Sequence, residues 1–124
     1  MNRGVDFLKQ GDFDRSIEAL KYATTVNPKL ATAFSNLGTA YQKKGDLDAA
    51  IESYSRAIKL DLRLPMAHVN LGHALAGKGD ARMAARSFRR ALALDPDHTV
   101  AEETLEALEK LGVRADDEDE DEDD

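Results

Sequence analysis

The sequence repeats itself with a period of 34 residues. When residues 31–64 are aligned with residues 65–98, 14 of the 34 positions carry the same amino acid. A third copy, which lacks its beginning, occupies residues 1–30. A period of this length is typical of solenoids, in which each unit buries its apolar face against its neighbours. The sequence therefore predicts a series of similar units rather than one central core.

Each unit has the apolar spacing of two helices. Within residues 31–44, and again within residues 47–60, apolar and small residues recur at intervals of three and four, which indicates helices with one buried face. Gly45 and Asp46 stand between these segments. Glycine can adopt the left-handed conformation that ends a helix, and an aspartate can accept hydrogen bonds from the N–H groups that begin the next one. The other two units carry the same pair, at Gly11–Asp12 and Gly79–Asp80.

The predicted first helix of each unit contains an interior glycine, at Gly4, Gly38 and Gly72. Such a glycine weakens a helix by about 1 kcal/mol relative to alanine. We therefore expect close packing to compensate, with the second helix presenting small residues, namely Ser16, Ala50 and Ala84. Pro65 is expected at the first position of its helix, where the missing N–H has no helical partner to lose.

These residues resemble the tetratricopeptide repeat family. The family's pattern is an aromatic residue, Leu-Gly and a second aromatic residue, then Ala and an aromatic residue in the second helix, and a closing Pro. The matching positions are Phe34, Leu37, Gly38, Tyr41, Ala50 and Tyr54, and then His68, Leu71, Gly72, Leu75, Ala84, Phe88 and Pro96. His68 and Leu75 stand where the family pattern has aromatic residues, and in the unit at residues 31–64 Leu62 stands where the pattern has its closing Pro. The resemblance covers residues 1–98 and implies an all-α, right-handed solenoid of antiparallel helix hairpins that binds other proteins.

The predicted organisation is a solenoid over residues 1–112 followed by an acidic tail over residues 113–124. The solenoid comprises a partial repeat at 1–30, repeats at 31–64 and 65–98, and a capping helix at 99–112. Residues 116–124 hold nine of the 24 acidic residues, so 15 acidic residues remain against 17 Lys and Arg, and the net charge of −7 becomes about +2 for the body. We expect a disordered tail, because a run of like charges has no apolar surface to bury.

The composition disfavours several classes of protein. Cysteine is absent, which excludes disulfides and thiolate metal sites. No apolar run reaches the length of a membrane span, and residues 1–9 lack the apolar core of a signal peptide. The expected location is the cytoplasm, unless a targeting segment precedes this sequence. Histidine spacing and glycine placement match no metal site or phosphate loop, and the small body charge disfavours nucleic acid. We expect no enzymatic activity, no cofactor and no membrane partner.

The free face of the first helices is the candidate binding site. In stacked hairpins these faces line a concave groove, and its predicted residues are Asn2, Lys9, Thr32, Asn36, Thr39, Lys43, Met66, Asn70 and His73. Asn2, Asn36 and Asn70 are 34 residues apart, and an Asn side chain can pair with both the C=O and the N–H of an extended peptide. This column resembles the asparagine ladder in the repeat arrays of the O-linked N-acetylglucosamine transferases. The alternative is that Asn is only a tolerated polar residue.

The resemblance argues against one known ligand class of the family. Some members grip the C-terminal carboxylates of heat-shock chaperones with a clamp of Lys, Asn and Arg, and only Asn36 matches that clamp here. The predicted partner is therefore a protein or peptide of another kind.

A second candidate surface is cationic. The spacing of Arg82, Arg86, Arg89 and Arg90 places them on one side of a predicted helix. They could form an anion patch for an acidic partner or for the chain's own tail, although a solvated helix face is the alternative. Two further functions stay open. The chain could be a scaffold that forms a homo-oligomer through exposed repeat ends, or a domain that recruits substrates for an enzyme on another chain.

Overall fold

The computed structural model describes residues 3–110 and 112–113, and over these residues all regular secondary structure is α-helix. The predicted all-α class and helical repeat architecture are confirmed. Two predicted features, Asn2 and residues 114–124 of the acidic tail, lie outside the described residues. The chain divides into two compact units, residues 1–62 and 63–124.

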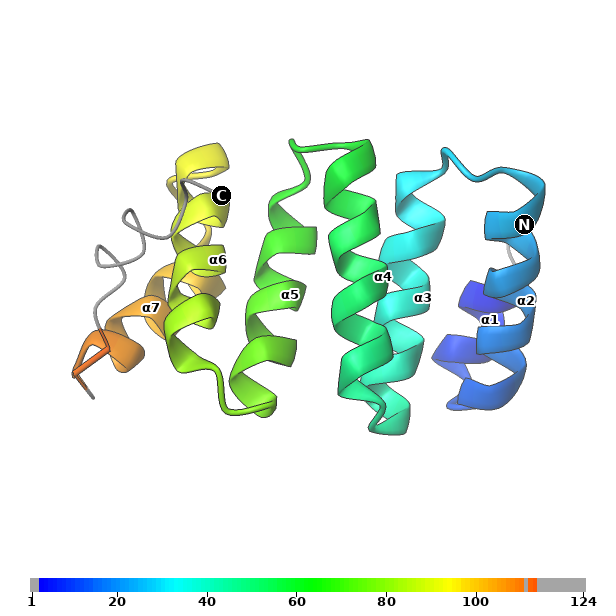
Figure 1. Ribbon diagram of the computed structural model, residues 1–124, viewed down its shortest axis with the longest axis horizontal. Helices are drawn as coiled ribbons and strands as arrows, with labels where there is room; N and C mark the ends of the chain where they lie inside the picture. The colour runs from blue at the N-terminus through cyan, green and yellow to red at the C-terminus, as the bar shows by residue number, and fades with distance from the viewer. Residues whose placement is uncertain (1–2, 111, 114–124) are drawn as a thin grey trace. The chain divides into compact units, whose positions relative to one another are not determined.

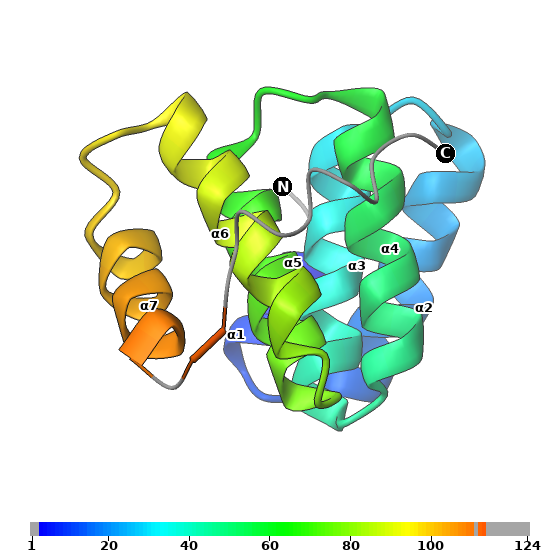
Figure 2. The same ribbon diagram turned by 60° about the vertical axis from the view of Figure 1, so that its left-hand side comes forward.

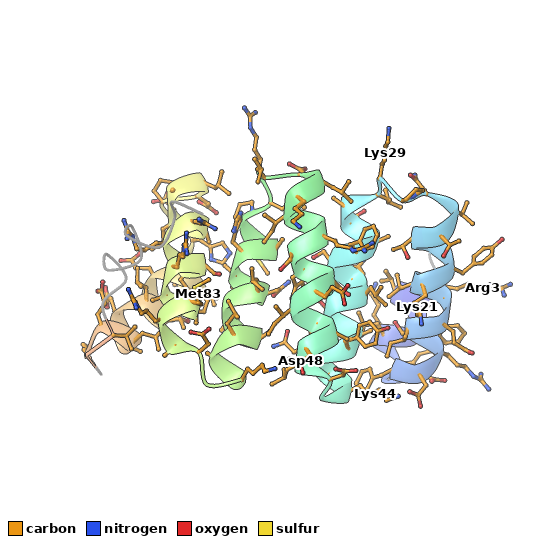
Figure 3. The ribbon with its side chains drawn as sticks, viewed as in Figure 1. Arg3, Lys21, Lys29, Lys44, Asp48 and Met83 are labelled. Atoms are coloured by element: carbon orange, nitrogen blue, oxygen red, sulfur yellow. The ribbon has the colours of Figure 1, made fainter. Side chains whose placement is uncertain are left out.

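Unit 1, residues 1–62, contains two helix hairpins (Figure 1). Its helices are α1 (Arg3–Lys9), α2 (Phe13–Val26), α3 (Ala31–Lys44) and α4 (Leu47–Leu60). Helix α1 packs against α2, α2 against α3, and α3 against α4. The contacts between α2 and α3 join the two hairpins. An apolar cluster that includes Ile17, Leu20 and Leu37 fills the space between the hairpins. At the C-terminal end of α3, Lys44 (labelled in Figure 3) forms an ion pair with Asp14 of α2, and this pairing raises the pKa of the lysine.

Unit 2, residues 63–124, contains one hairpin and an additional helix (Figure 2). Its helices are α5 (Pro65–Gly77), α6 (Ala81–Leu94) and α7 (Thr99–Lys110). Phe88 of α6 is fully buried in a cluster with Val69 and Ala101, and leucines of α7 pack against this cluster. Helix α7 therefore covers the apolar face that the hairpin would otherwise expose. Pro65 is the first residue of α5, as predicted.

The Gly-Asp pairs form the predicted turns. Gly11, Gly45 and Gly79 have φ values of +80°, +98° and +95°, which lie in the left-handed region that favours glycine. In each turn the following aspartate accepts a hydrogen bond of 3.2 Å from the backbone N–H three residues later, at Arg15, Ala49 and Met83. The aspartates therefore act as N-caps and fix the start of each second helix.

Replacing Asp46 with alanine is expected to lower the free energy of unfolding by about 1 kcal/mol, because the N–H of Ala49 loses its cap. Urea titration followed by circular dichroism measures the change. Asparagine at the same position keeps a capping oxygen, so Asp46→Asn should remain close to the wild-type protein. Equal stability of Asp46→Ala and the wild-type protein would contradict the capping role.

The packing against the interior glycines differs in part from the prediction. An ideal Cβ on Gly38 would lie 2.7 Å from the ring of Tyr54, and one on Gly72 would lie 2.7 Å from the ring of Phe88. The atoms nearest to these glycines therefore belong to the aromatic ring one turn later, and not to the expected Ala50 and Ala84. In the first hairpin the prediction is correct, since the Ser16 hydroxyl donates a 2.7 Å hydrogen bond to the carbonyl of Gly4.

Candidate functional site

In unit 1 the predicted groove residues lie on α1 and α3. Lys9, Thr32 and Lys43 are exposed, whereas Asn36 and Thr39 are half-buried. Thr32, Asn36, Thr39 and Lys43 follow one another at intervals of three and four, so α3 carries them on one face. This face combines an amide, a hydroxyl and a cation, and it can offer both donors and acceptors to a bound chain.

Thr39 is already engaged within the protein. The single proton of its hydroxyl can go to the carbonyl of Ser35 at 3.2 Å or to the hydroxyl of Tyr54 at 3.0 Å. The Tyr54 hydroxyl in turn donates to Oε1 of Gln42 at 2.9 Å, and burial raises the pKa of this tyrosine. Thr39 therefore orients the buried tyrosine, and Asn36 is the better candidate for contact with a partner. The sequence gives no sign of this network, because its members come from two helices.

In unit 2 the predicted groove residues lie on α5. Met66 and His73 are exposed and Asn70 is half-buried. The ring of His73 contacts the buried ring of Phe88 edge-on, with centroids 5.2 Å apart, and partial burial lowers the pKa of the histidine. At neutral pH His73 therefore offers an uncharged imidazole beside Asn70.

Met66 is held by a contact that the sequence does not predict. Its sulfur lies 3.2 Å from Nε2 of His98, in the turn between α6 and α7. Nδ1 of His98 accepts a hydrogen bond of 3.3 Å from the N–H of Ala101, so Nε2 carries the proton that points to the sulfur. His98 thus caps α7 and fixes Met66, while His68 is buried.

The predicted anion patch lies on α6, and its four arginines differ in exposure. Arg82 and Arg90 are exposed, whereas Arg86 and Arg89 are half-buried. Nη1 of Arg86 lies 3.8 Å from the sulfur of Met83, so the guanidinium group of this arginine contacts its own helix. An anion-binding role for these residues stays a prediction.

A further surface, on α1 and α2 of unit 1, was not among the predicted sites. Tyr22 and Val26 are 72% and 66% exposed, and they border a groove of about 1060 Å³ together with Phe7. The sequence contains one signal of this surface: Tyr22 stands where the later repeats have Arg56 and Arg90. Exposed apolar groups gathered on one face indicate an interaction surface.

The described residues show no features of two other kinds of site. Residues 3–110 and 112–113 contain no group of three or more His, Cys, Asp or Glu side chains placed to hold a metal ion. Over the same residues, every helix is too short or too polar to cross a lipid bilayer.

The structure is similar to solved helical repeat proteins. The second repeat domain of human RPAP3, determined in complex with an HSP70 peptide, is 27% identical, with a TM-score of 0.83 over 86% of this chain and 89% of that one. MamA is 25% identical, with a TM-score of 0.85 over 90% of this chain and 66% of that one. The Yersinia enterocolitica chaperone SycD, in complex with a peptide of the translocator YopD, shares the fold at 21% identity, with a TM-score of 0.84 over 88% of each chain.

No curated protein matches the chain. The tetratricopeptide repeat pattern matches residues 1–63 and, separately, residues 65–98. One match spans unit 1 and the other lies within unit 2, and together they include the helices that carry the candidate site. The chain therefore belongs to the tetratricopeptide repeat family.

Proposed function

We propose that the chain is a protein interaction module that binds an extended segment of a partner on the free faces of its first helices. The observation that carries this proposal is the pair Asn36 and Asn70, which occupy equivalent, half-buried positions on α3 and α5. A partly buried side chain is restricted in its motion, so its amide can bind a peptide group with a smaller loss of entropy. Each amide can accept from one backbone N–H and donate to one backbone C=O.

The neighbours of each asparagine favour an extended backbone over a charged terminus as the ligand. Thr32 and Lys43 flank Asn36, and Met66 and His73 flank Asn70. Unit 1 therefore offers an ammonium group, and unit 2 offers a neutral imidazole and an apolar thioether, so each face suits a segment of mixed composition. The complexes of human RPAP3 with an HSP70 peptide and of SycD with a YopD peptide support peptide binding as the function of this fold.

Replacing both asparagines with alanine is expected to weaken peptide binding by about 1 to 3 kcal/mol, since each substitution removes hydrogen bonds to the ligand. A library of displayed random peptides supplies a ligand, and calorimetry with that peptide compares Asn36→Ala, Asn70→Ala and the double variant. The matched control is Asn27→Ala, because Asn27 is an exposed asparagine at the end of α2. Unchanged affinity in the double variant, with an unchanged melting temperature, would move the site away from these faces.

Self-association is a second candidate function, and one observation favours it. The exposed groove on α1 and α2 carries Tyr22 and Val26, on a helix that contains none of the predicted peptide-binding residues. Peptide binding and self-association can therefore coexist and can be tested separately.

A further inference from the structure

The groove on α1 and α2 has an apolar lining with large and small residues on one helix face. Ala19, Tyr22, Ala23 and Val26 stand at positions i, i+3, i+4 and i+7 of α2 and so share one face, and Phe7 of α1 lines the same groove. The two alanines leave depressions beside the tyrosine and valine. A helix that brings large side chains to this face can insert them above the alanines.

The second hairpin of unit 1 shows how the equivalent face is normally covered. Leu37, which is equivalent to Arg3 in the repeat, is only 5% exposed because α2 packs over it. Arg56, which is equivalent to Tyr22, lies over the ring of Phe34 with 5.8 Å between the guanidinium carbon and the ring centroid. In the first hairpin the position equivalent to Leu37 is exposed, and the apolar Tyr22 stands where the second hairpin has an exposed arginine.

Charged residues on the groove restrict what can cover it. Arg3 stands at the repeat position equivalent to the buried Leu37, and in Figure 3 its side chain points outward past α2. Arg15 also lines the groove, and its contact with Asp12 leaves further N–H donors that would lose water when the groove is covered, which is costly without a second acceptor. The occupant must therefore provide carboxylates as well as apolar side chains. Glu18 lies one turn from Arg15 on the same lining, so a second copy of this surface provides both.

We propose that the protein forms a two-fold symmetric dimer through the α1–α2 groove, with Glu18 of each copy paired with the arginines of the other. A two-fold axis brings the same patch of both copies together, so Tyr22 and Val26 of one copy cover the alanines of the other. Arg15 is exposed and already contacts Asp12 at 3.5 Å, and its five N–H donors allow a second carboxylate to bind. This inference rests on the self-association function and is independent of the peptide-binding faces.

The first test measures the mass of the full chain in solution at protein concentrations between about 1 μM and 1 mM. The upper concentration is high enough to detect a weak dimer. Sedimentation equilibrium should show a monomer that converts to a dimer as concentration rises. Tyr22→Glu should raise the dimer Kd by about tenfold or more, because it places an unpaired carboxylate in the apolar contact. The control is Val100→Glu, which changes an exposed valine of α7 and should leave the Kd unchanged. A wild-type protein that stays monomeric to the highest concentration overturns the proposal and would indicate that the groove binds a different protein.

The second test exploits the symmetry. Arg15→Glu alone makes both surfaces of a dimer acidic, and Glu18→Arg alone makes both basic, so each variant should self-associate at least about tenfold more weakly than the wild-type protein. Mixing the two variants should restore the dimer, because the acidic surface of one chain now meets the basic surface of the other. A mixture that remains monomeric overturns the two-fold pairing. Circular dichroism of each variant confirms that it is folded.

Discussion

Replacing Phe88 with alanine is expected to lower the free energy of unfolding by about 3 to 5 kcal/mol, the range for deleting a buried aromatic side chain. Phe88 is fully buried among Val69, Ala84 and Ala101, and it is the largest side chain of this cluster. Helix α7 packs on the same cluster through its leucines. The loss should therefore weaken the attachment of α7 as well as the hairpin. Urea unfolding followed by circular dichroism measures the change.

Two comparisons identify the cause of this loss. Phe88→Leu keeps most of the apolar volume and should cost less than Phe88→Ala. Tyr22→Ala, measured in dilute solution, removes an aromatic ring that is 72% exposed and should change stability by less than about 0.5 kcal/mol. The pKa of His73 provides a local measurement, because Phe88 contributes to the burial that lowers it. If the pKa of His73 does not rise in Phe88→Ala, the edge-on contact is not what buries the histidine.

Much of the fold follows from local chemistry that repeats every 34 residues. A Gly-Asp pair determines where one helix ends and the next begins, because the glycine conformation and the aspartate cap act within a few residues. Pro65 marks the start of α5 for the same reason. The residues that face Gly38 and Gly72, by contrast, depend on contacts between two helices. Ala50 and Tyr54 are separated by one helical turn and share a face, so periodicity alone does not distinguish which of them meets the glycine.

The candidate site is less accessible to sequence reasoning, because side chains from different helices change one another's roles. Thr39 has the spacing of a groove residue, yet its hydroxyl is bound to Tyr54 of α4. Met66 has the same spacing, and its sulfur is held by His98 from beyond α6. Conversely, Tyr22 has the apolar character of a core position, and the arginines at the equivalent positions of the later repeats are the one sequence signal that it lies at the surface. Helical periodicity predicts which face a side chain occupies, whereas its partners depend on neighbouring helices.

Placing alanine at position 38 is expected to destabilise the protein by about 1 to 3 kcal/mol, although alanine is the better helix former. The new Cβ would lie 2.7 Å from Cδ1 and Cε1 of Tyr54, closer than carbon atoms normally approach. The ring has little freedom to move, because it is 1% exposed and its hydroxyl is bound to Thr39 and Gln42. Overpacking should therefore outweigh the gain in helix propensity of about 1 kcal/mol.

The role of the tyrosine ring is tested by a double-mutant cycle with Tyr54→Leu. That substitution alone should be destabilising, because it removes a buried ring together with its hydrogen bonds. In the Tyr54→Leu background, however, Gly38→Ala should cost much less than in the wild-type protein, since the atoms that the Cβ would meet are absent. The two changes should then be non-additive, with a coupling energy of about 1 kcal/mol or more. Additive effects would show that the glycine is required for some reason other than contact with Tyr54.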